Sequence, residues 1–136
     1  MVLIRNALVK EVEEVFDLIE RGVNEGSILK RTKTEISSLI RNELVFVAED
    51  NSKLVGIVIL DYYSKRLSEL RSMYVMAEYR NSGVGKLLVN ALLKKAEQLK
   101  IKEVMTITLK EMAPWFEKSG FSEEVHGFKV ALFKKL

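Results

Sequence analysis

The feature that most constrains the fold is a long amphipathic helix that the pattern predicts between two strands. Over Val84–Lys100, apolar side chains recur every three or four residues on one face, with Lys and Glu on the opposite face. The flanking segments, Leu67–Val75 and Glu103–Leu109, are strand-like. A strand, a helix and a second strand form a right-handed crossover, which makes the two strands parallel. The sequence therefore predicts an α/β fold built around this unit.

The other segments predict a mixed sheet with further helices on its faces. Residues 53–63 are apolar almost throughout, which is typical of a strand covered on both sides. They form a predicted antiparallel hairpin with residues 44–50 around the turn Asp50–Ser52. A strand is expected over Val2–Arg5, and a closing pair of strands is expected from Phe121 onward. Helices are expected over Lys10–Arg21 and Ala113–Ser119, and a further helix is expected to begin with Thr34 as its N-cap. The predicted order is βααβββαβαββ.

Composition limits the chemistry that the chain can support. A length of 136 residues favours a single domain over residues 1–136. The absence of cysteine excludes disulfides, thiolate metal sites and an acyl intermediate on a cysteine, and one histidine argues against a metal site. The net charge is +3, but Lys and Arg are interleaved with Glu and form no basic stripe with aromatic residues. We therefore expect neither a metal nor a nucleic-acid partner.

The hydropathy pattern also bears on location. The longest apolar run, Leu54–Leu60, is far too short to span a bilayer. The N-terminal segment becomes acidic too early for a signal peptide. We therefore expect a cytoplasmic protein without a membrane partner.

The segment with the most chemical information is Arg80-Asn81-Ser82-Gly83-Val84-Gly85-Lys86, which lies between a predicted strand and the long helix. Backbone N–H groups at the start of a helix bind anions, glycines let a phosphate approach the backbone, and Arg80 adds positive charge. A Walker A loop would need Gly at position 80 and Ser or Thr at 87, and a dinucleotide-binding loop would need a glycine at 88. The chain has Arg80, Leu87 and Leu88 instead, so both motifs are excluded.

This segment resembles the hallmark of the GNAT acetyltransferase superfamily. The hallmark begins with a strand that ends in an apolar residue, any residue and Val. A loop follows in which Arg or Gln is separated by any two residues from a Gly, and that Gly by any one residue from a second Gly or an Ala. Here Met73-Tyr74-Val75 precedes Arg80 to Gly85, and Trp115–Phe121 is similar to the later helix and Gly-Phe signature. The predicted element order matches as well. The resemblance implies a GNAT-like mixed central β-sheet flanked by helices, and acetyl-CoA as cosubstrate.

Within this superfamily, the chain resembles the acetyltransferase domain of N-acetylglutamate synthases. The similar segments are 25–32, 47–50, 54–56 and 69–72. The likeness implies transfer of an acetyl group from acetyl-CoA to the amino group of a small molecule, such as the amino acid glutamate. It departs after residue 121, because only residues 123–129 stand where those enzymes usually carry a longer segment. Part of the glutamate pocket is therefore in question.

The resemblance also implies where the cosubstrate binds. The pyrophosphate would lie on the amides of Ser82 to Lys86. The pantetheine arm would pair with the open edge between Met73–Val75 and the strand that carries Thr106 and Thr108. The backbone N–H of Tyr74 or Val75 would meet the thioester oxygen, which gains negative charge as the amine attacks.

The implied acceptor side centres on Glu69, the expected general base for an amine that must attack unprotonated. Ser72 matches a substrate-side residue, and Arg31 and Arg71 are expected carboxylate clamps because a guanidinium suits a carboxylate. Strict strand alternation puts Glu69 and Ser72 on opposite faces, so they share a site only if a β-bulge lies between them, and the resemblance implies such a bulge because the superfamily has one in this strand. Without cysteine, direct attack in a ternary complex is the simplest mechanism. Phe116 stands where many relatives have the tyrosine that protonates the thiolate, so that proton donor is left open.

Other interpretations stay open at this point. The acceptor could be a protein N-terminus or another small amine, or the chain could be a CoA-binding module without turnover. Glu69 could simply pair with Arg71, and Arg31 could be held in a salt bridge. Trp115 and Phe116 could be core residues. A homodimer is neither required nor excluded by the sequence.

Overall fold

The computed structural model describes residues 1–126 and 129–136. Its central feature is a seven-stranded sheet in the order β1-β2-β3-β4-β5-β7-β6. Within the described residues, β4 and β5 are the parallel neighbours, and the other neighbouring strands are antiparallel. The strands are β1 Leu3–Asn6, β2 Val45–Asp50, β3 Lys53–Asp61, β4 Ser68–Val75, β5 Glu103–Leu109, β6 Ser122–His126 and β7 Lys129–Lys135. The predicted order βααβββαβαββ and the GNAT-like fold class are confirmed.

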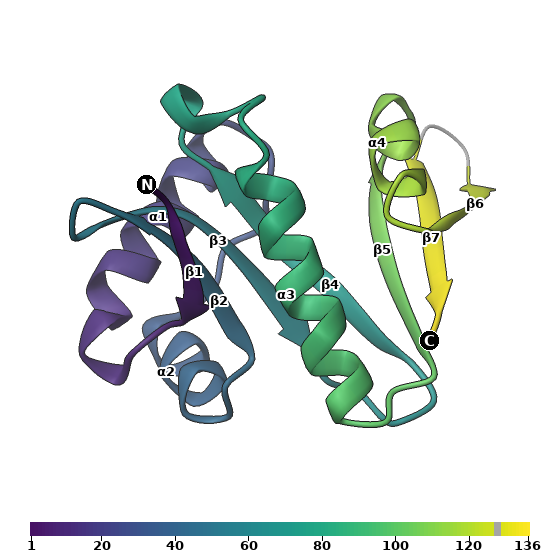
Figure 1. Cartoon of the computed structure of the whole chain (residues 1–136), viewed down its shortest axis with the longest axis horizontal. Coiled ribbons are helices and arrows are strands. Elements are labelled where there is room, and N and C mark those ends of the chain that lie inside the picture. The colour runs from purple at the N-terminus through teal and green to yellow at the C-terminus, as the bar shows by residue number, and fades with distance from the viewer. Residues whose placement is uncertain (127–128) are drawn as a thin grey trace.

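Helices cover both faces of the first four strands (Figure 1). Helix α3 packs on β2, β3 and β4 from one side, and α1 packs on β3 and β4 from the other, with α2 beside it. Helix α4 lies by β6 and β7. The helices are α1 Val12–Asn24, α2 Lys33–Arg41, α3 Val84–Gln98 and α4 Ala113–Glu117, with short 3-10 turns at Val9–Glu11, Ala77–Tyr79 and Lys110–Met112. In the described part of the chain, no helix combines the length and apolarity needed to cross a membrane.

Strand β3 forms the centre of the core, as its sequence predicts. Each of its residues from Leu54 to Asp61 is buried, because helices pack on both faces of the sheet at this point. The hairpin that joins it to β2 turns at Asn51 and Ser52, whose φ angles are +50° and +63°. Two residues with positive φ form the tight turn that suits the twist of a hairpin.

Two helix starts differ from the prediction. Helix α1 begins at Val12 rather than Lys10, because a 3-10 turn occupies Val9–Glu11. The N-cap of α2 is Thr32, not Thr34. The Thr32 hydroxyl accepts a hydrogen bond from the Glu35 backbone N–H at 3.1 Å, and the Glu35 carboxylate reaches back to the Thr32 N–H. This reciprocal pair forms a capping box, which Thr34 cannot form because it has no Glu or Gln three residues on.

Strands β4 and β5 pair over a short stretch and then separate. Ser68 pairs with Val104 and Glu69 with Met105, and no further rung joins these strands in the described residues. Beyond Glu69, β5 continues against β7 while β4 continues against β3. The second half of β4 therefore has a free edge on the β5 side, as the resemblance implied.

Strand β4 also contains a β-bulge. Arg71 pairs with Ile59 and Tyr74 pairs with Ile57, so two residues of β4, Ser72 and Met73, stand opposite one residue of β3. Ser72 itself has a φ of +53°, in the left-handed region. The bulge reverses the alternation of side chains, so residues on the two sides of it can share a face although their spacing is odd.

Candidate active site

The segment 80–86, hereafter the α3 loop, presents a set of backbone donors. Helix α3 begins at Val84 with Gly83 as N-cap, and the φ of Gly83 is +88°, which favours glycine. The first backbone bond into this turn runs from the N–H of Leu87 to the carbonyl of Gly83. In the described ranges no side chain caps α3, so the amides before Leu87 are free to bind an anion.

Arg80 is fixed in place at the start of the α3 loop. Its Nε donates to the carbonyl of Val75 at 2.8 Å, and one terminal nitrogen donates to the Glu25 carboxylate at 2.8 Å. Its guanidinium carbon lies 5.4 Å from the centre of the Tyr74 ring, within the range of a cation–π interaction. The loop is thereby tied to the end of β4 and to the end of α1.

Glu25 and Tyr74 complete this contact. The Tyr74 hydroxyl donates to Glu25, whose carboxylate therefore accepts from both Tyr74 and Arg80. These two donors hold the pKa of Glu25 below its usual value. Burial and the neighbouring Glu25 carboxylate raise the pKa of Tyr74, so Tyr74 stays protonated at neutral pH. Glu25 lies in a segment similar to the synthases, but the sequence alone predicted no role for it.

Aromatic residues from α4 pack beneath the loop. A Cβ at Gly85 would lie 3.2 Å from the Trp115 ring, so a glycine keeps α3 close to α4. Trp115 stacks edge-on against Phe116 at 4.9 Å between centroids, and Phe116 against Phe121 at 5.6 Å. Phe116 is buried. Phe116 is therefore a core residue, and its ring carries no proton for a leaving thiolate.

The free edge of β4 presents the N–H of Val75. The next N–H, that of Met76, donates to the carbonyl of Val55 in the loop-side half of β3 at 2.9 Å. Because N–H groups point to alternate edges along a strand, the N–H and carbonyl of Val75 face away from β3. The bond from Arg80 Nε to the Val75 carbonyl lies on that same edge. Between Tyr74 and Val75, the geometry thus favours Val75 as the donor that faces the gap.

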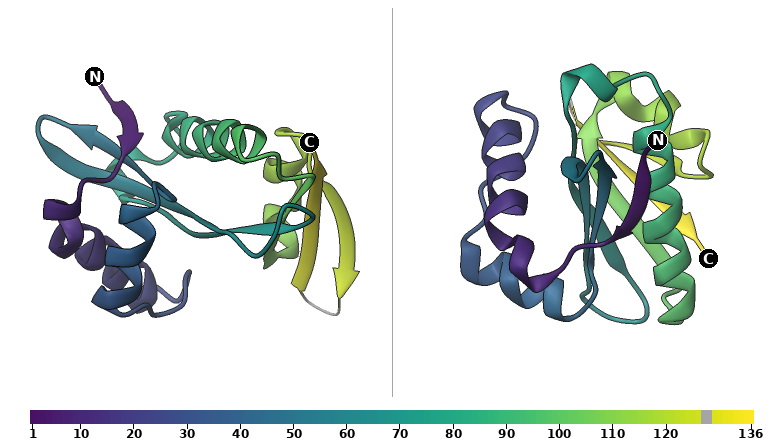
Figure 2. Two further views of the ribbon diagram at one scale, coloured as in Figure 1. Left: turned by 90° about the horizontal axis from the view of Figure 1, so that it is seen from below. Right: turned by 60° about the vertical axis from the view of Figure 1, so that its left-hand side comes forward.

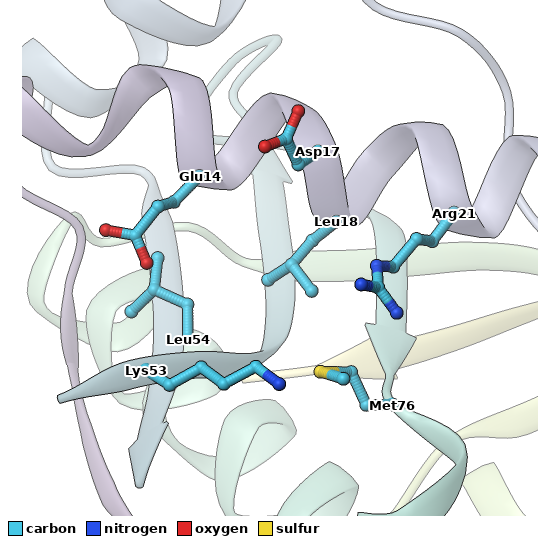
Figure 3. Close-up of a pocket in the computed structure, with 7 residues that line it drawn as sticks. All are labelled: Glu14, Asp17, Leu18, Arg21, Lys53, Leu54 and Met76. Carbon is cyan, nitrogen blue, oxygen red and sulfur yellow. The ribbon is translucent and has the colours of Figure 1, made fainter. Parts of the chain in front are cut away.

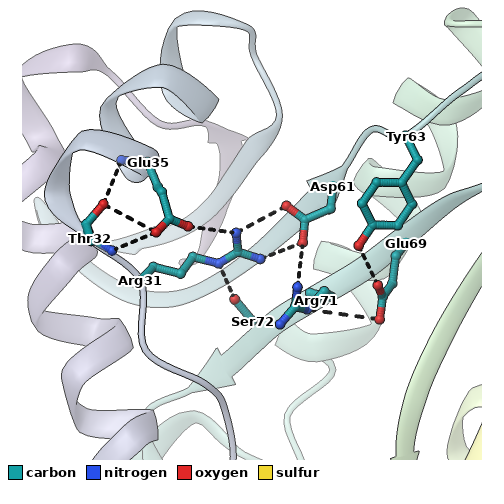
Figure 4. A network of polar contacts seen from close by, with 8 residues as sticks. All are labelled: Arg31, Thr32, Glu35, Asp61, Tyr63, Glu69, Arg71 and Ser72. Atoms are coloured by element: carbon teal, nitrogen blue, oxygen red, sulfur yellow. Dashed lines mark hydrogen bonds and ion pairs between the residues drawn. The ribbon is translucent and has the colours of Figure 1, made fainter.

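A connected set of polar side chains lies where β4 leaves β5 (Figure 4). We call it the β3–β4 network, and its members are Arg31, Asp61, Tyr63, Glu69, Arg71 and Ser72. Its centre is a two-pronged ion pair: the terminal nitrogens of Arg31 donate to the two oxygens of Asp61 at 3.1 and 2.6 Å. The Nε of Arg31 donates to the Ser72 hydroxyl at 2.8 Å. The Arg31 side chain is only 7% exposed, and each of its three nitrogens has a partner within the protein.

Arg71 and Glu69 are more loosely held. An Arg71 terminal nitrogen lies 3.6 Å from Asp61, and its Nε lies 4.0 Å from Glu69. Glu69 accepts a hydrogen bond from the Tyr63 hydroxyl at 2.7 Å. Burial and the Glu69 carboxylate raise the pKa of Tyr63, which keeps it a donor. Glu69 and Arg71 are therefore neighbours, as the sequence allowed, but their 4.0 Å separation leaves both side chains able to bind a ligand.

The bulge explains why these side chains meet. Glu69 and Arg71 precede it, Ser72 is its first residue and Tyr74 follows it, and all four lie on the face of the sheet that α1 covers. Arg71 and Ser72 are adjacent in sequence, so a regular strand would point them to opposite faces. The bulge expected from the sequence is therefore present, and it lies at Ser72.

Two members of the network were missed by the sequence analysis. Asp61 ends an apolar strand, and its pairing opposite Glu69 follows only from the register of β3 and β4. Tyr63 follows in the loop after β3 and was given no role. A lone carboxylate closing an otherwise apolar strand is the signal that could have drawn attention to Asp61.

Two open depressions of the surface lie away from this network. A depression of about 140 Å³ is lined by Glu14, Asp17, Leu18, Arg21, Lys53, Leu54 and Met76. Figure 3 shows Lys53 and Arg21 extending toward Met76 from two sides. A second depression of about 400 Å³ lies beside Arg5 and Glu11, and Glu14 borders both. None of the site residues predicted from sequence lines either one.

Comparison with known proteins identifies the family. The acetyltransferase (GNAT) domain matches residues 41–123, which include β2 to β5, the α3 loop and the first residues of β6. The chain belongs to the GNAT acetyltransferase family. An uncharacterised N-acetyltransferase of Chlorobaculum tepidum is 31% identical over 120 residues, covering 88% of this chain and 75% of its own length. The expected enzyme class, an acetyl-CoA-dependent N-acetyltransferase, is confirmed.

Further GNAT relatives include larger proteins. An amino-acid acetyltransferase of Pasteurella multocida is 27% identical over 118 residues, which are 87% of this chain but only 26% of that protein. The N-acetylglutamate synthase of Neisseria gonorrhoeae, solved with coenzyme A and N-acetylglutamate, superposes with a TM-score of 0.86 at 19% identity. That match covers all of this chain and 35% of the synthase. The chain thus spans about a quarter to a third of the length of these two proteins, and the structural likeness shows the shared fold.

Proposed function

We propose that this GNAT chain transfers the acetyl group of acetyl-CoA to the α-amino group of a free amino acid, with glutamate as the first acceptor to test. The observation that carries the proposal is the β3–β4 network, which places an acidic group and a loosely held guanidinium together where β4 leaves β5. A carboxylate base and a guanidinium side by side suit an α-amino acid, which offers an amine and a carboxylate on one carbon.

The proposed cosubstrate site follows the free edge of β4 and the α3 loop. The diphosphate lies on the free amides at the start of α3, and the pantetheine arm lies along the edge that β5 leaves open. The residues proposed to contact acetyl-CoA are Met73, Tyr74, Val75, Arg80, Asn81, Ser82, Gly83, Val84, Gly85 and Lys86. Arg80 has its charge shared with Glu25, so its proposed role is chiefly to fix the loop through Val75.

The reaction needs a base that accepts a proton from the amine and a hydrogen-bond donor to the thioester oxygen. As the C–N bond forms, the thioester oxygen gains charge, and the Val75 N–H on the open edge is the proposed donor to it. Glu69 takes the proton of the attacking amine, directly or through a water molecule. The C–S bond then breaks and the CoA thiolate leaves. With no cysteine in the chain, the acetyl group passes directly to the amine in a ternary complex.

The arginines have different proposed roles in acceptor binding. Arg71 is partly exposed and makes no close ion pair, so it is the proposed clamp for the substrate carboxylate. Arg31 already binds Asp61 and Ser72, so it positions them instead of holding substrate. Ser72 then faces the acceptor only through its remaining lone pair and proton. Of the two arginines expected as carboxylate clamps, Arg71 keeps that role in this proposal and Arg31 does not.

The relatives support the choice of an amino acid. The Pasteurella protein is an amino-acid acetyltransferase, and the Neisseria synthase was solved with N-acetylglutamate. The main alternatives are an acetyltransferase acting on a protein N-terminus or another amine, and a CoA-binding module without turnover. Both predict no release of CoA with free amino acids, and they differ in whether another amine, such as a peptide N-terminus, is acetylated.

Two measurements test the proposal. Acetyl-CoA should raise the melting temperature of the chain, whereas ATP and NAD should not, because the α3 loop lacks their motifs. An acceptor screen with the common amino acids, read by release of free CoA thiol, should then find turnover. Stabilisation without thiol release for any amino acid would refute the amino-acid proposal, and release with a peptide N-terminus alone would favour the protein-acetylating alternative.

A further inference from the structure

The charges around the proposed acceptor site determine which kind of amino acid can bind there. This inference rests on the proposed function. Arg31 has its three nitrogens engaged by Asp61 and Ser72. Arg71 is the guanidinium of the network that has room for a substrate carboxylate, since its nearest acidic oxygens are 3.6 and 4.0 Å away. The network therefore offers one place for one carboxylate.

The same region is already rich in negative charge. Among the described residues of and beside the network, two guanidinium groups face three carboxylates: Asp61, Glu69 and Glu35, the last at 4.0 Å from Arg31. An acceptor α-carboxylate bound to Arg71 adds a fourth. A second substrate carboxylate would have no guanidinium left to pair with and would stand near like charges, which disfavours it.

An apolar surface adjoins the network on the same face of the sheet. Met105 pairs with Glu69, so their side chains share a face, and Ile107 and Leu109 continue that face along β5. Ile107 and Leu109 are exposed. Helices α1 and α2 lie over the first strands of the sheet and not over β5 (Figure 2). The uncharged side chains of this surface therefore start directly beside Glu69, the proposed base.

We infer that the acceptor is an α-amino acid with one carboxylate and an apolar side chain. Its carboxylate binds Arg71, its amine faces Glu69, and its side chain lies along Met105 and Ile107. Desolvating the side-chain carboxylate of glutamate against this apolar surface is unfavourable, whereas leucine or methionine gains burial there.

Kinetics on the full chain test this with three acceptors at saturating acetyl-CoA. We expect kcat/KM for L-leucine to exceed that for L-glutamate by about tenfold or more. Leucinamide, which lacks the carboxylate, should be a poorer acceptor than leucine by a similar factor. A kcat/KM for glutamate equal to or above that for leucine would overturn the inference, and so would equal values for leucine and leucinamide.

A charge placed on the apolar surface sharpens the test. Ile107→Lys supplies a cation for a second carboxylate, so the leucine-to-glutamate ratio should fall by about tenfold. The matched control is Leu3→Lys on β1, because Leu3 is 56% exposed and Ile107 53%. The control should keep the wild-type ratio. An unchanged ratio in Ile107→Lys, or an equal change in both variants, would contradict the inference.

The two proposals fail in different ways. If no amino acid releases CoA while acetyl-CoA still stabilises the chain, the amino-acid function is wrong and this inference fails with it. If glutamate is the preferred acceptor, the proposed function stands and only the inference about the apolar acceptor is wrong.

Discussion

The α3 loop and the β3–β4 network are built in opposite ways. The loop is a run of consecutive residues whose donors are backbone N–H groups left free by the start of a helix. The network gathers side chains from the segment before α2, from β3 and the loop after it, and from β4. The loop depends on local backbone conformation, whereas the network depends on strand register, on a bulge and on a helix cap.

The two regions also differ in how far they are satisfied without a ligand. The amides of Ser82 to Lys86 in the loop have no backbone partner in the described chain, so this part of the loop is suited to receive a negative charge from outside. The members of the network mostly bind one another, and each of the three nitrogens of Arg31 has a partner within it. The difference suggests that the loop binds by free donors, while the network binds through the few groups that its internal pairs leave loose.

The largest effect is expected where the network is buried. Asp61→Asn removes the charge that Arg31 pairs with, and both side chains are largely buried. Leaving the Arg31 guanidinium without its partner should lower the free energy of unfolding by about 3 kcal/mol. Urea unfolding followed by circular dichroism measures the loss.

The matched control for Asp61→Asn is Glu13→Gln, which breaks the pair between Glu13 and Lys33. Both side chains of that pair are more than half exposed. Its loss should change stability by less than about 1 kcal/mol. Equal losses in the two variants would show that the Arg31–Asp61 pair is no more important than a surface pair.

The next effect separates chemistry from cosubstrate binding. Glu69→Gln keeps the shape of the side chain and its contact with Tyr63 but removes the base. We expect kcat to fall by about 100-fold while the affinity for acetyl-CoA is unchanged. Steady-state kinetics and calorimetry measure the two quantities. Glu123→Gln, an exposed change on β6, is the control and should leave both as in the wild type. Wild-type rates for Glu69→Gln across the pH range would remove Glu69 from the mechanism.

A change in the α3 loop should instead lower the affinity for acetyl-CoA. Gly83→Val places a branched side chain at a φ of +88°, a conformation that costs an L-residue about 1–2 kcal/mol. The amides that follow should shift, so acetyl-CoA affinity should fall by about tenfold or more. Gly26→Val is the control, because Gly26 also has a positive φ and open space around it. We expect both variants to lose a similar amount of stability and only Gly83→Val to lose affinity for acetyl-CoA. Unchanged affinity in Gly83→Val would count against the loop as the diphosphate site.

The contrast between the regions explains what could be predicted from sequence. The α3 loop, the crossover and the buried β3 were predicted because spacing, glycine and apolar runs act locally. The separation of β4 from β5 and the bulge at Ser72 followed from the family resemblance. Asp61 could not be assigned, because its contact with Arg31 joins residues 30 positions apart across a strand end. Sequence spacing carries no information about such a contact.

The smallest effect tests how the network is anchored. Thr32 caps α2 directly after Arg31, so the cap fixes the backbone from which Arg31 reaches Asp61. Thr32→Ala should lower stability by about 1 kcal/mol. It should also raise the KM for the acceptor slightly while the affinity for acetyl-CoA stays the same. Thr34→Ala, two residues into the helix, is the matched control and should be neutral or slightly stabilising, because alanine favours helix. A larger loss for Thr34→Ala than for Thr32→Ala would mean that the cap lies at Thr34, as the sequence alone had suggested, and that the anchor of Arg31 lies elsewhere.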